Sequence, residues 1–267
     1  MDNRSIGVFD SGLGGLTVVK ELKKRLPNES IIYFGDTGRV PYGTRSRDTV
    51  SLYAAQAESL LLRHDVKMII AACGTVSSVA AHTGDNLPVK FMGVVASAAK
   101  EAAMVTKNGR VGVIGTAATI NSGAFNRHIA AINSGIEVFS NECSLLVPLV
   151  ENGWIDREDE VTGLTVRRYL EPIKAAGVDT LILGCTHFPV LSDIIADYMG
   201  GDCVLINTGR TTAAAAGEYL GQNGMLAGAA AGDRYYFTDK NAAFEQTVKI
   251  LMGHDLENTG FIPVDSL

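Results

Sequence analysis

The chain contains one short pattern twice, and each copy ends in a cysteine. Val66–Cys73 reads VKMIIAAC and Val178–Cys185 reads VDTLILGC, with an apolar run that closes on a small residue before the thiol. Such a run, bounded by small and polar residues, is typical of a strand buried on both faces of a parallel sheet. Open parallel sheets bind ligands beyond the carboxyl ends of their strands. The repeat therefore predicts two matching halves, each of which contributes one thiol to a shared cleft.

The order of elements along the chain agrees with two such halves. Short apolar strands alternate with helical patterns, which predicts an α/β fold made of parallel sheets. The first unit is expected to begin with a strand at Ile6–Phe9 and to end with one at Val89–Val95. The second is expected to begin at Arg110–Ile114 and to end at Val204–Ile206.

The segment after Thr211 predicts a helix, a strand at Arg234–Phe237 and a last helix, which we assign to the first sheet. We therefore expect two pseudo-symmetric α/β domains with the active site in the cleft between them. Residues 1–96 plus 208–267 form the first, discontinuous domain, which carries Cys73. Residues 97–207 form the second, which carries Cys185.

Composition argues against several classes of protein. The net charge is −6 in 267 residues, so clustered cations for nucleic acid are not expected. No run of about 18 apolar residues is present, so no membrane span is expected. The four cysteines form no C-x-x-C pair, which predicts reduced thiols in a cytoplasmic protein and no structural zinc or other metal site.

The first predicted strand is followed by a glycine-rich turn. Asp10–Gly15 reads DSGLGG, but Thr17 stands where the dinucleotide-binding pattern needs glycine, and the P-loop lysine is absent. We therefore expect the glycines to let the backbone turn tightly and approach a small ligand, with the following helix N-terminus facing an anion.

Two thiols at equivalent strand ends have three interpretations. They are core residues, a common fate of cysteine, or a redox pair, or two acid/base groups on opposite sides of a substrate carbon. Small or polar residues follow Cys73 and Cys185, unlike a continuing core. Asp10 at the end of the first strand and His187 beyond Cys185 can each move a proton to or from a nearby thiol. These neighbours favour the third interpretation.

Six segments carry a more specific signal. They are IGVFDSGLGGLT (Ile6–Thr17), YFGDT (Tyr33–Thr37), VPYGTR (Val40–Arg45), GVIGTAAT (Gly112–Thr119), VPLVE (Val147–Glu151) and LGCTHFP (Leu183–Pro189). Together they resemble the glutamate racemases of the aspartate/glutamate racemase superfamily, and the resemblance covers nearly the whole chain. It implies an isomerase that inverts glutamate at Cα without a cofactor and supplies D-glutamate for peptidoglycan. It also implies a homodimer.

The resemblance assigns roles residue by residue. Cys73 and Cys185 match the two catalytic acid/base thiols, acting on the D- and L-enantiomer respectively, with Asp10 assisting the first and His187 the second. Asp36 and Glu151 match auxiliary acidic positions, for which hydrogen bonds that fix loops are an equal alternative. Positions that contact substrate correspond to Asp10, Ser11, Pro41, Tyr42, Gly43, Gly74, Thr75, Thr116, Thr119, Thr186 and His187.

One departure from the family pattern bears on the site. The family usually has asparagine after the first cysteine, whereas this chain has Gly74. The glycine lacks a side-chain amide that could bind the substrate, so the family pattern does not predict the substrate affinity and specificity of this chain. A racemase of aspartate or another acidic amino acid is therefore one alternative, and a non-catalytic protein that binds an acidic metabolite is another. If the protein is a racemase, the two sulfurs lie on opposite sides of the substrate Cα and are about 7 Å apart, which is too far for a disulfide.

Overall fold

Two parallel sheets form the framework of the protein. The computed structural model describes residues 1–267, and every strand pair in it is parallel. The first sheet has the order β10-β9-β2-β1-β3-β4, and its strands are β1 Ile6–Asp10, β2 Ile31–Gly35, β3 Met68–Ala71, β4 Lys90–Gly93, β9 Arg234–Phe237 and β10 Thr259–Phe261. The second has the order β6-β5-β7-β8, and its strands are β5 Arg110–Gly115, β6 Glu137–Glu142, β7 Thr180–Leu183 and β8 Val204–Asn207.

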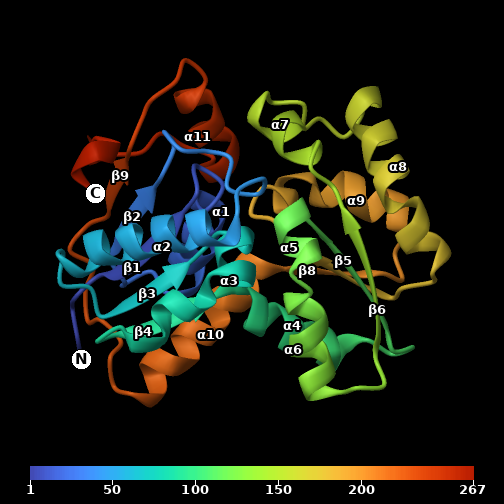
Figure 1. Ribbon diagram of the computed structural model, residues 1–267, viewed down its shortest axis with the longest axis horizontal. Coiled ribbons are helices and arrows are strands. Elements are labelled where there is room, and N and C mark those ends of the chain that lie inside the picture. The colour runs from blue at the N-terminus through green and yellow to red at the C-terminus, as the bar shows by residue number, and fades with distance from the viewer.

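The internal repeat predicted from the two cysteine segments is present in the sheets. The order β2-β1-β3-β4 in the first sheet matches β6-β5-β7-β8 in the second, so β3 and β7 occupy equivalent places. Every residue of these two strands is buried. The fold predicted from the sequence, two parallel α/β units, is therefore confirmed. Figure 1 shows the two units side by side, with both chain termini in the first.

Helices cover the sheets and connect the two units. They are α1 Leu16–Arg25, α2 Arg47–Leu62, α3 Gly74–Val79, α4 Val94–Val105, α5 Ala117–Asn121, α6 Ala124–Ile132, α7 Leu146–Glu151, α8 Glu160–Ala175, α9 Ser192–Met199, α10 Thr208–Gln222 and α11 Phe244–Met252. Short 3₁₀ turns lie at Ala81–Asn86, Phe188–Leu191 and Val264–Ser266. The chain crosses between the sheets through α4 and through α10, and α10 packs on both α1 and α4. No helix is long and apolar enough to span a membrane.

Local sequence explains where several helices begin. Ser46 caps α2 by accepting a hydrogen bond from the Thr49 amide at 3.2 Å, and Asp159 caps α8 through the Thr162 amide at 2.8 Å. These side chains satisfy amides that the helix leaves without a partner. The apolar residues of each helix then face its sheet and complete the core.

Some elements differ from what the sequence pattern predicts. Ser77 and Ser78 predict the start of the helix after Cys73, but α3 starts at Gly74, and the Ser77 hydroxyl donates to the Ala71 carbonyl at 2.9 Å. The pattern predicts a loop region at Leu145–Trp154, but this segment contains α7. It also offers Thr119 or Asn121 as the cap of the helix after β5, whereas Thr116 caps α5.

The C-terminal strands join the first sheet. Strand β9 pairs with β2, and β10, which the sequence pattern did not reveal, pairs with β9. The precise boundaries predicted for the two domains, at residues 96/97 and 207/208, stay a prediction. The second of them coincides with the start of α10.

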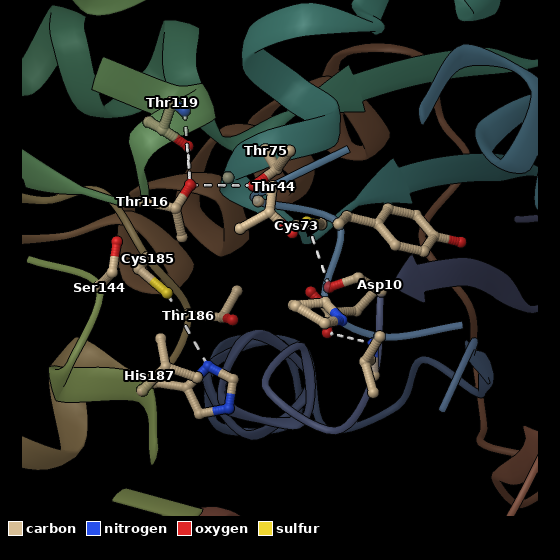
Figure 2. A pocket seen from close by; sticks show the side chains of 18 of the residues that line it. Asp10, Thr44, Cys73, Thr75, Thr116, Thr119, Ser144, Cys185, Thr186 and His187 are labelled. Carbon is tan, nitrogen blue, oxygen red and sulfur yellow. Dashed lines mark hydrogen bonds between the residues drawn. The ribbon is translucent and has the colours of Figure 1, made fainter. Parts of the chain in front are cut away.

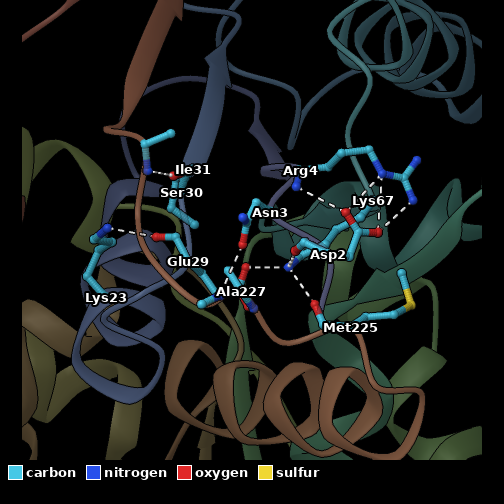
Figure 3. A network of polar contacts seen from close by, with 12 residues as sticks. Asp2, Asn3, Arg4, Lys23, Glu29, Ser30, Ile31, Lys67, Met225 and Ala227 are labelled. Atoms are coloured by element: carbon cyan, nitrogen blue, oxygen red, sulfur yellow. Dashed lines mark hydrogen bonds and ion pairs between the residues drawn. The ribbon is translucent and has the colours of Figure 1, made fainter.

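A buried polar network lies at the amino ends of the first sheet's strands, away from their carboxyl ends (Figure 3). The Lys67 ammonium lies 2.6 Å from a Glu29 carboxylate oxygen, and their side chains are 0% and 2% exposed. Lys67 also donates to the carbonyls of Asp2 and Met225, both at 2.7 Å. Glu29 accepts from the Ala227 amide at 2.8 Å. The pair therefore ties the N-terminus and the segment after α10 to the sheet.

Candidate active site

A cavity of about 370 Å³ lies where the carboxyl ends of the two sheets meet. This volume is in the range of small-molecule sites. Of the residues that the sequence assigns to a site, those that line the cavity are Asp10, Ser11, Pro41, Tyr42, Gly43, Cys73, Gly74, Thr75, Thr116, Thr119, Glu151, Cys185, Thr186 and His187. The two halves therefore bring nearly the whole predicted set together, and Asp36 alone does not line the cavity.

The two cysteines of the repeat occupy equivalent positions. Cys73 follows the end of β3 by two residues, and Cys185 follows the end of β7 by two. Their exposed fractions are only 5% and 7%, and both are free thiols. Figure 2 shows the two side chains entering one cavity from different halves of the molecule.

Cys185 belongs to a chain of three polar groups. Its sulfur lies 3.8 Å from His187 Nδ1, and His187 Nε2 lies 3.1 Å from a Glu151 carboxylate oxygen. Burial disfavours the charged imidazole, but the hydrogen bonds to Cys185 and Glu151 outweigh it and raise the pKa of His187 to about 10. The imidazole therefore holds its proton at neutral pH, next to the sulfur.

Cys73 has a different environment. Its sulfur donates to the Ser11 hydroxyl at 3.6 Å. Burial, with the nearby Asp10 carboxylate, raises the pKa of the Cys73 thiol to about 12, so this group keeps its proton at neutral pH.

The Asp10 carboxylate is 2% exposed, and burial raises its pKa. One of its oxygens accepts from the Gly12 amide at 2.9 Å. The other has no hydrogen-bond partner. A buried carboxylate oxygen without a partner beside a cavity is placed to accept a proton or a cationic ligand group.

Hydroxyl groups dominate the polar wall opposite Asp10 (Figure 2). Thr75 and Thr116 are joined at 3.1 Å between their oxygens, and Thr116 and Thr119 at 3.1 Å. No lysine or arginine lines the cavity. An anionic ligand would therefore be held by hydroxyls and backbone amides rather than by a fixed cation.

Comparison with known proteins agrees with this geometry. The sequence profile of the Asp/Glu/Hydantoin racemase family matches residues 6–216. A glutamate racemase from Geobacter metallireducens is 44% identical over 95% of this chain and 94% of its own, and one from Neisseria meningitidis serogroup A is 48% identical over 84% and 82%. The crystal structure of the Francisella tularensis glutamate racemase in complex with D-glutamate superposes with a TM-score of 0.92 at 36% identity, covering 100% of both chains.

This chain belongs to the Asp/Glu/Hydantoin racemase family. Glutamate racemases match over most of the chain at 44–48% identity, so the protein is a racemase of that group. An aspartate racemase homologue from Pyrococcus horikoshii, 15% identical with a TM-score of 0.57, shares the fold alone.

Two glycines of the glycine-rich turn make room for neighbouring side chains. A Cβ on Gly14 would lie 2.3 Å from the Thr186 hydroxyl and 2.6 Å from the His187 ring, and one on Gly15 would lie 2.5 Å from Asp10 Cβ. These two glycines thus admit site residues, and Gly12 of the same turn lines the cavity, so the expected approach of the turn to a small ligand stays a prediction. Thr17, at the place of the missing dinucleotide glycine, donates to the Thr186 carbonyl at 2.8 Å.

Asp36 lies behind the cavity wall and fixes a loop. Its carboxylate accepts hydrogen bonds from the Tyr42 hydroxyl, from Arg39 Nε at 2.6 Å and from the Thr238 hydroxyl at 2.9 Å. The Arg39 guanidinium stacks 3.9 Å from the centre of the Tyr53 ring. This geometry favours the loop-fixing interpretation of Asp36, because the carboxylate acts on the site through Tyr42.

Glu151, the other auxiliary candidate, does line the cavity and contacts His187 directly. It reaches the site as the last residue of α7, the helix that was expected to be a loop.

Sequence reasoning missed several wall residues. Thr44 directly follows the predicted Pro41–Gly43 set, so reading that motif to its end would have included it. Ser144 comes two residues after β6, at the carboxyl edge where ligands collect. The apolar part of the wall is formed by Leu13, Val40, Val147 and Pro148, which carry no chemical signal of their own. No group of three or more His, Cys, Asp or Glu side chains is arranged to hold a metal ion.

Proposed function

We propose that this racemase interconverts L- and D-glutamate by proton transfer at Cα between two thiols. The observation that carries the proposal is the pair of buried cysteines at equivalent strand ends, which share one cavity and each have a hydrogen-bond partner of their own, Ser11 for Cys73 and His187 for Cys185. Inversion needs one group to remove the proton on one face and another to return a proton on the opposite face. The pseudo-symmetric repeat supplies two such groups.

The surroundings of the two thiols differ. The imidazole of His187 holds its proton beside the Cys185 sulfur and is anchored by Glu151, so it can exchange a proton with that sulfur, while Cys73 keeps its own proton. With L-glutamate, Cys185 removes the Cα proton and Cys73 donates its own to the other face. The reverse reaction exchanges these roles, and His187 and Asp10 reset the thiols between turnovers.

The Cα proton of an amino acid is a very weak acid, so the carbanion must be stabilised as it forms. We assign this to hydrogen bonds that hold the α-carboxylate, which takes up the developing charge. We propose that the substrate contacts a set of residues that all line the cavity: Asp10, Ser11, Pro41, Tyr42, Gly43, Gly74, Thr75, Thr116, Thr119, Thr186 and His187. The free oxygen of Asp10 suits the ammonium group, and the threonine hydroxyls suit a carboxylate. These side chains supply both proton transfers, so we propose a mechanism without a cofactor.

The substrate assignment rests on the relatives, because an aspartate racemase would use the same scaffold. The Francisella tularensis enzyme, whose structure was solved in complex with D-glutamate, matches the whole chain. We therefore propose glutamate as the substrate, and D-glutamate as a product used for peptidoglycan. Comparing the turnover of glutamate with that of aspartate distinguishes a glutamate racemase from an aspartate racemase. A homodimer, a cytoplasmic location and the lack of a nucleic-acid partner stay predictions from the sequence.

The test is circular-dichroism measurement of glutamate inversion, with α-hydrogen exchange in deuterated water followed in parallel. Cys73→Ser and Cys185→Ser should each lower inversion by at least about 100-fold, because serine is a far weaker acid than a thiol. Cys203→Ser is the matched control, since that half-buried cysteine lies outside the cavity. Substantial inversion by both cavity variants would overturn the two-thiol scheme. Binding of glutamate by wild type without any exchange would identify a binding protein instead.

A further inference from the structure

One hydroxyl group joins the two halves of the molecule beside Cys185. Thr17, the second residue of α1 in the first half, has its Oγ1 2.8 Å from the carbonyl oxygen of Thr186 in the second half. Both residues are buried. A Cβ built on Gly14 would meet the Thr186 hydroxyl and the His187 ring, so the turn before α1 packs directly against the segment that follows β7. The bond therefore lies within a close contact between the halves.

The Thr186 carbonyl depends on this donor because its own turn cannot supply one. The carbonyls on either side of it, those of Cys185 and His187, each accept from the amide three residues later at 3.1 Å. The corresponding donor for Thr186 would be Pro189, which has no N–H. No other group donates to this carbonyl. The proline thus leaves a gap in the turn, and a side chain from the other half fills it.

The Thr17 hydroxyl has a second oxygen within reach, the carbonyl of Gly14 at 2.9 Å. That carbonyl already accepts from the Thr17 amide at 3.0 Å, whereas the Thr186 carbonyl has no alternative donor. A hydroxyl has only one proton to donate, and a buried carbonyl without a donor is costly. The balance of donors therefore directs the proton across to Thr186.

Thr186 lies between two groups that act on L-glutamate in the mechanism above. Cys185 precedes it and His187 follows it, and the Cys185 sulfur lies 3.8 Å from His187 Nδ1. Fixing the carbonyl between them fixes the backbone that carries both side chains. We propose that Thr17 is a positioning residue that holds Cys185 and His187 in place against the first half. This proposal rests on the two-thiol racemisation described above.

Loss of the bond affects one of the two proton transfers. Cys185 is on the anchored segment, whereas Cys73 follows β3 in the first half. When Cys185 removes the Cα proton of L-glutamate, the C–H bond breaks, an S–H bond forms and the electron pair stays on the substrate. A misplacement of about 1 Å lowers such a rate about 100-fold. Without the Thr17 hydroxyl, transfer at Cys185 therefore becomes the slower of the two.

Glutamate deuterated at Cα reports which transfer is slower. Cys185 breaks the C–D bond of the deuterated L-enantiomer, and Cys73 breaks that of the deuterated D-enantiomer. A slower transfer at Cys185 therefore raises the isotope effect on kcat/KM for L-glutamate and lowers it for D-glutamate. Each isotope effect is a ratio of two rates from one preparation, so a smaller amount of folded protein changes neither value.

The experiment measures inversion and both isotope effects for wild type, Thr17→Val and Thr17→Ser. Valine keeps the branched shape of threonine without the hydroxyl, and serine keeps the hydroxyl without the methyl group. We expect inversion by Thr17→Val to fall at least about tenfold, with isotope effects that move in opposite directions. Thr17→Ser, which retains the bond, should stay within about threefold of wild type.

Thr162→Val is the matched control. This threonine is also buried, and its hydroxyl also donates to a backbone carbonyl, that of Trp154 at 2.9 Å. Both of these residues belong to the second half, and neither lines the cavity. Removing this hydroxyl should therefore leave both isotope effects at their wild-type values. Thermal melting of each variant, followed by circular dichroism, shows whether the fold is retained.

The outcomes separate this proposal from the one it rests on. If wild type neither inverts nor exchanges glutamate, the two-thiol function fails whatever the variants do. If wild type racemises, Thr17 is not a positioning residue when Thr17→Val keeps the wild-type rate or both isotope effects, or when Thr17→Ser loses as much activity as Thr17→Val. If Thr17→Val does not fold, Thr17→Ala removes the same hydroxyl without putting a methyl group in its place, and the same opposite changes in the isotope effects are expected.

Discussion

Replacing Lys67 with methionine tests how the buried network at the amino ends of the first sheet stabilises the protein. The substitution keeps the length and apolar stem of the side chain but removes its charge. The Glu29 carboxylate, 2% exposed, is then left with only the Ala227 amide as a partner. The carbonyls of Asp2 and Met225 lose a donor as well.

The expected loss follows from these contacts. Removing one partner of a buried ion pair costs about 3–5 kcal/mol, because the other charge stays buried without compensation. We therefore expect Lys67→Met to lower the free energy of unfolding by about 4 kcal/mol. For a chain of this size that corresponds to a fall in Tm of about 8–16 °C. Since the network lies away from the cavity, kcat of the surviving folded protein should match wild type.

The assay is thermal and urea unfolding followed by circular dichroism, with two comparisons. Lys24→Met removes an exposed partner of Glu21 and should cost less than about 0.5 kcal/mol. Lys67→Met combined with Glu29→Gln should recover much of the loss, because no uncompensated charge remains. The reasoning is refuted if the Lys67→Met variant melts within about 2 °C of wild type. It is also refuted if Glu29→Gln, added to Lys67→Met, lowers the free energy of unfolding further instead of restoring it.

Two further predictions concern the site. Glu151→Gln removes a carboxylate that raises the pKa of His187, so the pKa of His187 should fall from about 10 toward its ordinary value. The alkaline limb of the pH profile of kcat should then move to lower pH. If this limb does not move, Glu151 does not act through His187. Asp36→Asn weakens the bonds that hold Tyr42, so KM for both enantiomers should rise about tenfold, equivalent to about 1.4 kcal/mol, with a smaller change in kcat. Steady-state kinetics check this, and a fall in kcat at constant KM would point instead to a role in proton transfer.

The sequence was sufficient to predict the parallel sheets because their strands have a strong local signature. The runs that end at Cys73 and Cys185 are apolar throughout, and burial on both faces requires that composition. The repeat then implied equivalent strand ends, and the structure has them. Strand β10, by contrast, has only three residues and exposed ends, so its composition carries little signal.

The parts of the site that could not be predicted depend on contacts between distant segments. Asp36 and Glu151 look alike as acidic residues in short motifs, yet one lies behind the wall and the other contacts His187. Gly14 has no local feature that reveals the Thr186 side chain against it, because that contact forms only when the halves assemble. Sequence patterns report the burial of single elements, but such pairings arise from the assembled fold.

The absence of lysine and arginine from the cavity walls affects how the ligand arrives. His187 is the one basic side chain of the wall, while Asp10 and Glu151 are acidic. Long-range attraction therefore does little to draw in a substrate of net negative charge, and recognition begins only at short range, through hydroxyl and amide donors. Capture of substrate by such a pocket should be nearly indifferent to ionic strength, because there is little steering field for added salt to screen.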